Sequence, residues 1–185
     1  MVSSSRVPGE PGFWVLIAGD LFVFTVFFLT YAWYRGGEPE LFAATQATLN
    51  RGFGLLNTVL LLSSSLFVAI GVHRLRDRGM PASRHFLAAI LCGAGFVVVK
   101  IFEYGAKILA GVDVASNTFL VLYFAFTGIH LAHVLLGLGV LVVMRTAARE
   151  PEPASRVMLI ECGATFWHVV DLLWIVLFAL FYLIA

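Results

Sequence analysis

Charged side chains are scarce in this sequence: they make up 12% of its 185 residues, whereas apolar residues make up 61%. A soluble domain usually carries about a quarter charged residues and roughly half apolar ones. A chain this short has too little interior to bury the excess, so we expect much of its surface to face lipid. The formal net charge is +1 and no basic run is present, which excludes a typical nucleic-acid-binding surface.

Cysteine is also scarce. The two cysteines, Cys92 and Cys162, both fall inside apolar runs, and neither belongs to a CxxC pair. This pattern argues against a disulfide framework and against a cysteine-based metal site, and we expect no metal bound by this chain. Both side chains are interpreted as small buried hydrophobes.

Long apolar runs, by contrast, are abundant. A helix that crosses about 30 Å of hydrocarbon needs roughly 20 mostly apolar residues. Five segments meet this requirement, and polar stretches with glycine or proline connect them; the segments are 13–33, 53–72, 85–109, 118–144 and 157–184. The sequence therefore predicts an all-α, polytopic membrane protein, with one five-helix domain over residues 13–185. The first run lacks a small-x-small cleavage site and is interpreted as a retained span.

The basic residues predict the orientation of this bundle. With five spans, residues 1–12 and the second and fourth connections share one side of the membrane. That side carries Arg6, Arg74, Arg76, Arg78, Arg84, Arg145, Arg149 and Arg156, whereas the other carries Arg35, Arg51 and Lys107. The positive-inside rule then places the N-terminus in the cytoplasm and the C-terminus outside. We expect the membrane to be a bacterial plasma membrane.

Ionisable residues recur within the predicted spans, where they are costly and commonly face the bundle interior. Those at comparable depth lie on the third, fourth and fifth spans, and they are Lys100, Glu103, Tyr104, His130, His133, His168 and Asp171, with Glu161 nearer one end. We predict a buried hydrogen-bonded network that joins these helices, with Lys100 paired to Glu103 or to Asp171. For the three histidines, structural hydrogen bonding is the first interpretation, with heme ligation and proton transfer as alternatives.

Asp20 stands apart from this group because residues 15–29 offer no cation on the same helix. It lies about 10 Å from the inner boundary at 1.5 Å per residue. A carboxyl in apolar surroundings can exchange protons near neutrality. A proton-handling role is therefore predicted for Asp20, beside a structural one.

Four stretches of the chain resemble, in order, motifs of subunit III of the heme–copper oxidases in its five-helix form. LNT at 56–58 with LLSS at 61–64 is similar to the family's LNT…LLSS, and EY at 103–104 resembles the end of QxxEY. TGIHLAHV at 127–134 resembles TGFHGLHV, and WHVVDLLW at 167–174 resembles WHFVDVVW. The packing and motif residues assigned in this way are Asn57, Thr58, Ser63, Ser64, Gly128, Trp167 and Trp174.

The resemblance implies a subunit without a catalytic centre of its own. Hemes and copper would belong to a partner, catalytic subunit I, and this chain would bind that subunit, neighbouring subunits and phospholipids. In the family, a carbodiimide-reactive glutamate of the first span is tied to sustained proton uptake, and Asp20 takes its place here. Lys100 stands where the family pattern has glutamine, which brings a formal charge into the third span.

Three other functions are considered. The short chain also resembles the accessory subunit associated with nitric oxide reductase. For an oxidase, the sequence leaves two electron donors open, cytochrome c and quinol. A membrane cytochrome would use His133 and His168 as axial ligands on facing helices. A proton-coupled transporter would account for the buried acids, but such folds commonly show internal repeats, and this sequence shows none.

Overall fold

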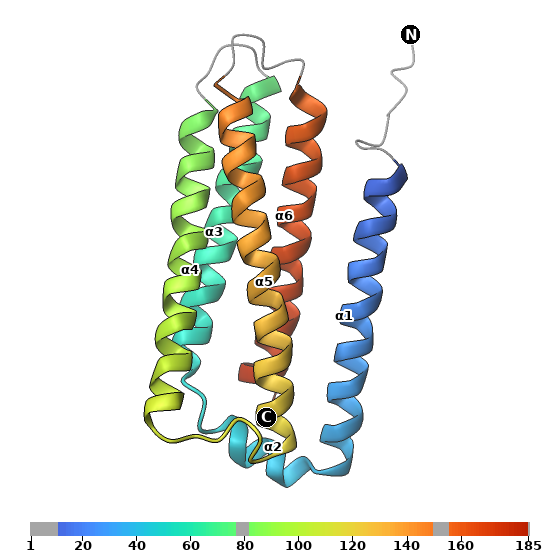
Figure 1. Ribbon diagram of the computed structural model, residues 1–185, viewed down its shortest axis with the longest axis vertical. Helices are drawn as coiled ribbons and strands as arrows, with labels where there is room; N and C mark the ends of the chain where they lie inside the picture. The colour runs from blue at the N-terminus through green and yellow to red at the C-terminus, as the bar shows by residue number, and fades with distance from the viewer. Residues whose placement is uncertain (1–10, 77–81, 150–155, 185) are drawn as a thin grey trace.

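The computed structural model describes residues 11–76, 82–149 and 156–184, and its regular elements there are helices (Figure 1). Five of them are long and apolar enough to cross a membrane. They are α1 (Pro11–Gly37), α3 (Arg51–Arg76), α4 (Ser83–Leu109), α5 (Thr118–Ala147) and α6 (Val157–Phe178), which continues into the π-helical turn η2 (Ala179–Leu183). The five predicted segments are confirmed as long apolar helices, and most of these helices extend a few residues further. Arg6, Arg78 and most of segment 1–12 lie outside the described residues.

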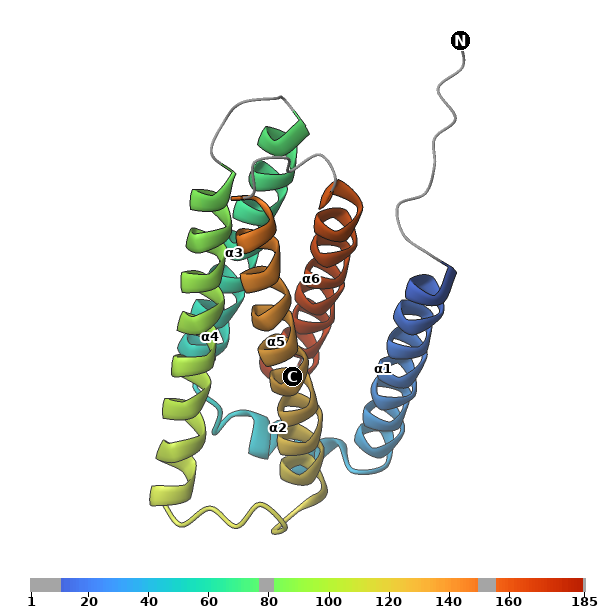
Figure 2. The same ribbon diagram turned by 45° about the horizontal axis from the view of Figure 1, so that its top comes forward.

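Helices α3, α4, α5 and α6 form a four-helix bundle, and α1 stands beside it against α5 and α6 (Figure 2). Because hydrocarbon offers no partner for backbone amides, apolar runs of this length satisfy their own hydrogen bonds as helices. Helix α1 buries three residues that are spaced by seven, Ile17, Phe24 and Tyr31. Helix α6 buries nine of its 22 residues. Helix α1 therefore touches the bundle along one narrow row of side chains, which we call the α1 seam.

A short helix that the sequence analysis did not predict, α2 (Pro39–Gln46), lies in the connection between α1 and α3. Pro39 sits in its first turn, where a missing amide hydrogen costs nothing. Its buried residue Phe42 packs edge-on against Tyr31 of α1 and Phe119 of α5, with ring centroids 5.4 and 5.5 Å apart. From the sequence this connection is visible only as a polar stretch, because eight helical residues are too few to show a clear apolar period.

The turn between α4 and α5 is fixed by local hydrogen bonds. Gly111 has a φ of 72°, and its amide donates to Ile108 while the amide of Val112 donates to Lys107. This is a Schellman motif, which needs a left-handed residue after the helix end. Asn117 then caps α5 by accepting a hydrogen bond from the amide of Leu120 at 2.9 Å.

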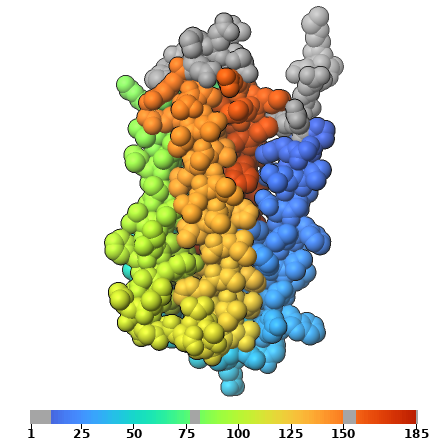
Figure 3. Space-filling model, in the orientation of Figure 1, coloured from blue at the N-terminus to red at the C-terminus, as the bar shows by residue number. Residues whose placement is uncertain are grey.

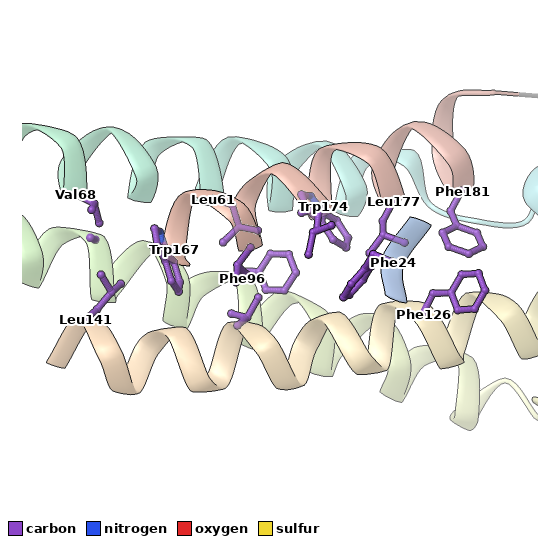
Figure 4. Close-up of a cluster of buried hydrophobic side chains, with 14 of the residues drawn as sticks. Phe24, Leu61, Val68, Phe96, Phe126, Leu141, Trp167, Trp174, Leu177 and Phe181 are labelled. Atoms are coloured by element: carbon purple, nitrogen blue, oxygen red, sulfur yellow. The ribbon is translucent and has the colours of Figure 1, made fainter. Parts of the chain in front are cut away.

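The core of the bundle is packed around large aromatic side chains. Trp167 and Trp174 of α6 and Phe96 of α4 are fully buried, and Figure 4 shows them beside Leu61. Trp167 lies against two glycines: a Cβ atom at Gly137 would lie 2.6 Å from its ring, and one at Gly93 would lie 3.0 Å away. Small residues at these positions let the helices approach closely, as membrane bundles require.

Candidate functional site

The most enclosed polar group is a cluster of Lys100, Glu103, Tyr123 and Tyr182, which we call the lysine cluster. The Lys100 ammonium donates to Glu103 Oε2 at 2.9 Å and lies 3.2 Å from both tyrosine hydroxyls. The Tyr182 hydroxyl donates to the other carboxylate oxygen of Glu103 at 2.6 Å. Lys100 is 0% exposed and Glu103 is 3% exposed. The lysine cluster therefore closes on itself inside the bundle.

Aromatic rings complete the surroundings of this cation. The Lys100 nitrogen lies 5.0 Å from the Trp174 ring centroid and 5.1 to 5.8 Å from three tyrosine rings, those of Tyr104, Tyr123 and Tyr182. Ring faces attract a cation most strongly where water is excluded. The aromatic rings and the Glu103 carboxylate together offset the free-energy cost of removing the Lys100 ammonium from water.

Two members of the lysine cluster were missed in the sequence analysis. Tyr123 precedes Thr127 and His130 on one face of α5, and this spacing could have drawn attention to it. Tyr182 gave no such signal, because it belongs to η2. There the amide of Ile184 bonds to the carbonyl of Ala179, five residues earlier, and the wider turn brings the adjacent Phe181 and Tyr182 both into the core.

A second polar group lies at the α1 seam. Asp20 of α1 and His133 of α5 form a pair in which Oδ1 and Nε2 are 3.7 Å apart, and their side chains are 25% and 20% exposed. The other ring nitrogen of His133 bonds to the Ile129 carbonyl at 2.8 Å, which fixes the orientation of the imidazole. The ring of Phe24 packs edge-on against it at 5.4 Å. The basic partner that Asp20 lacks on its own helix is therefore found across the seam, on α5.

A third polar group joins α3 to α6. The Ser65 hydroxyl and His168 Nδ1 are 2.5 Å apart, and Asp171 is nearly buried, with its Oδ1 lacking a partner among the described residues. Closer to the end of both helices, Arg76 donates from Nη2 and Nε to Glu161 at 2.5 and 3.1 Å.

Three further hydrogen bonds between helices involve predicted residues. Trp174 donates to the Thr58 hydroxyl at 3.0 Å, Ser64 donates to the Ala89 carbonyl at 2.8 Å, and the Tyr104 and Thr127 hydroxyls are 2.6 Å apart. Among the described residues, the buried side chains of Asn57 and His130 have no hydrogen-bond partner. Ser63 and Gly128 are partly exposed.

The predicted polar residues thus form three separate groups in the structure and not the single network that the sequence predicts. Lys100 is paired with Glu103 and not with Asp171. His133 contacts α1 and His168 contacts α3, so the two imidazoles do not face one another as axial ligands of one heme would. Across the described ranges, no group of three or more histidine, cysteine or acidic residues is placed to hold a metal ion.

Comparison with known proteins gives a consistent result. The family model for cytochrome c oxidase subunit III matches residues 10–185. Over 94% of this chain, it is 27% identical to quinol oxidase subunit 3 of Bacillus subtilis (strain 168), covering 86% of that protein. The chain is also 30% identical to cytochrome bo(3) ubiquinol oxidase subunit 3 of Pseudomonas putida, over 94% of this chain and 84% of that protein. A heme-copper oxidase subunit I+III of Aeropyrum pernix is 25% identical over 92% of this chain and 22% of its own length.

Proposed function

Because the chain belongs to the cytochrome c oxidase subunit III family, we propose that it binds the catalytic subunit of a heme–copper oxidase and supports proton uptake through the Asp20–His133 pair. The names of its relatives identify it as a subunit III of such an oxidase. They give no support to the nitric oxide reductase alternative. One relative carries subunits I and III in its name as a single protein, which supports subunit I as the partner.

The observation that carries the proton-uptake proposal is the geometry of the Asp20–His133 pair. Its 3.7 Å separation exceeds an ordinary hydrogen bond of about 2.7 to 3.2 Å, so the two groups attract one another without being locked together. Carboxyl and imidazole groups are the side chains most used for proton transfer. Since both are partly exposed at the edge of the bundle, a neighbouring subunit can reach them.

The orientation inferred from the basic residues gives this pair a direction. With the N-terminus in the cytoplasm, Asp20 lies nine residues into α1, about 14 Å from its start at 1.5 Å per residue. In a bacterial plasma membrane, that position is on the side from which a respiratory oxidase takes up protons. The Asp20–His133 pair would then refill a proton path of the catalytic subunit.

Hemes and copper belong, in this proposal, to the partner subunits, and this chain contributes packing, lipid contacts and proton exchange. A groove of about 560 Å³ between α1, α5 and α6 supports the lipid contacts. Leu16, Leu136 and Phe166 are among the apolar side chains that line it. An acyl chain matches this lining.

The test is Asp20→Asn in the purified complex, with Asp20→Glu as the control that keeps a carboxyl group. We expect the asparagine variant to assemble and to start at a normal rate, but to lose activity after several-fold fewer turnovers and to take up protons more slowly. The glutamate variant should behave as the unchanged complex does. An unchanged lifetime and proton uptake in the asparagine variant would remove Asp20 from the mechanism and leave the structural role.

A further inference from the structure

A polar groove of about 370 Å³ lies between α3 and α6, on the opposite flank of α6 from the apolar groove. We call it the α3–α6 groove. Its polar lining consists of His73, Arg76, Glu161, Thr165 and His168. The Arg76–Glu161 pair lies where α3 ends and α6 begins, the upper end of the bundle in Figure 1, and the Arg76 side chain is 60% exposed there.

The deepest polar residue of this groove is exposed at a depth where lipid would be its neighbour. His168 lies 11 residues after the first residue of α6, about 17 Å along the helix at 1.5 Å per residue. This is near the middle of a hydrocarbon layer about 30 Å thick. The imidazole is nevertheless exposed on the surface of the chain. Exposure to hydrocarbon would be costly for such a group, so a polar occupant is required.

Two features favour water as that occupant. The groove volume is many times the roughly 30 Å³ that one water takes in the liquid, and its lining offers the several polar partners that a bound water needs. The charges at the mouth are already matched, because Arg76 is paired with Glu161, and this leaves little attraction for a free ion.

We propose that the α3–α6 groove is filled with water continuous with the aqueous phase at the α6 N-terminal end, and that His168 exchanges protons with this water. In the tautomer whose Nδ1–H donates to the Ser65 hydroxyl oxygen, Nε2 carries the lone pair, so Nε2 would accept a proton from a hydronium ion and release it again to water. This is a second protonatable site on α6, separate from the Asp20–His133 pair on α1 and α5.

Thiol labelling in the assembled complex tests whether the groove is hydrated. The test variant carries Thr165→Cys with Cys92→Ser and Cys162→Ser, so its one thiol lies in the α3–α6 groove. The control variant carries Cys92→Ser alone and keeps Cys162 as its one thiol. The retained Cys162 lies three positions before Thr165 but lines the apolar groove. A charged, membrane-impermeant methanethiosulfonate reagent should label Thr165→Cys at least tenfold faster than Cys162. Equal rates, or slower labelling of Thr165→Cys, would overturn the proposal.

A second measurement needs no cysteine variant. In bilayers that contain the unsubstituted chain, water-edited solid-state NMR reports which imidazoles receive magnetisation from water, and His168→Gln assigns the signal. His168 should receive it, whereas His130, fully buried against Phe96 and Trp174, should not. Absence of transfer to His168 would overturn the proposal. Neither readout involves Asp20, so these results are independent of the proton-uptake test.

Discussion

The lysine cluster and the Asp20–His133 pair each bring an acidic and a basic side chain together at membrane depth, yet they are built differently. In the lysine cluster, an ammonium that is 0% exposed has a carboxylate at 2.9 Å and two phenol hydroxyls at 3.2 Å. In the Asp20–His133 pair, 3.7 Å separates the groups and each side chain is at least one-fifth exposed. The first is closed and saturated with hydrogen bonds, and the second is open and loosely joined.

This difference separates structure from function. A buried ion pair is stabilising only as long as both partners are present, because either charge alone is left without water. An open pair at a helix seam can gain or lose a proton without disturbing the core. We therefore expect changes in the lysine cluster to affect stability and changes in the Asp20–His133 pair to affect proton transfer.

The largest effect is expected from Glu103→Gln, which leaves the buried Lys100 without its counter-charge. Removing one partner of a buried pair costs about 3 to 5 kcal/mol. The double change Lys100→Gln with Glu103→Gln should recover most of this loss, since it removes both charges and restores the glutamine of the family pattern. Thermal unfolding of the purified chain in detergent measures the stability of the single and of the double variant. A double variant as unstable as the single one would show that the charges are not the cause.

A smaller effect is expected where Trp167 packs against α5. Gly137→Ala places a Cβ atom 2.6 Å from the Trp167 ring, and overpacking of this kind costs about 1 to 3 kcal/mol. Gly139→Ala is the matched control, because nothing lies within 4 Å of its Cβ position two residues later on the same helix. The same unfolding assay should show a lower midpoint for Gly137→Ala alone. Equal unfolding midpoints for Gly137→Ala and Gly139→Ala would mean that the Trp167 ring moves aside at no cost.

The smallest effect on stability is expected from Thr58→Val, which removes the acceptor of the Trp174 indole hydrogen bond across α3 and α6. Interhelical hydrogen bonds in membrane bundles contribute about 0.6 kcal/mol on average. Trp174→Phe should cost more, because it also shrinks a fully buried side chain, and the two changes together should cost less than their sum. Strict additivity in this double-mutant cycle would argue against a contribution from the bond.

The spans and the depth of the polar residues could be predicted from the sequence because both depend on apolar run length and helical spacing. The i, i+3 relation of Lys100 and Glu103 was visible, and their pairing is local. Which helix each histidine faces was not visible, because it depends on how the helices rotate against one another. The partners of Asp20 and His168, on α5 and α3, required the three-dimensional arrangement.

Helix α1 illustrates the same limit in its packing. Its apolar residues occur on all sides, so the sequence did not reveal that Ile17, Phe24 and Tyr31 are the ones that become buried at the seam. Figure 3 shows how much of this helix stays uncovered by the rest of the chain. Exposed apolar side chains on α1 include Phe22, Leu29 and Trp33. Such a surface is compatible with lipid or with a neighbouring subunit, and composition does not distinguish the two.

The most direct test of the contrast between the lysine cluster and the Asp20–His133 pair is labelling of the complex with a hydrophobic carbodiimide, followed by mass spectrometry of the modified peptides. The reagent reacts with a protonated carboxyl group in apolar surroundings. We predict modification at Asp20 and none at Glu103, whose carboxylate oxygens are held by Lys100 and Tyr182. Modification of Glu103 with Asp20 left unmodified would contradict the assignment of proton exchange to the open pair and of structure to the closed one.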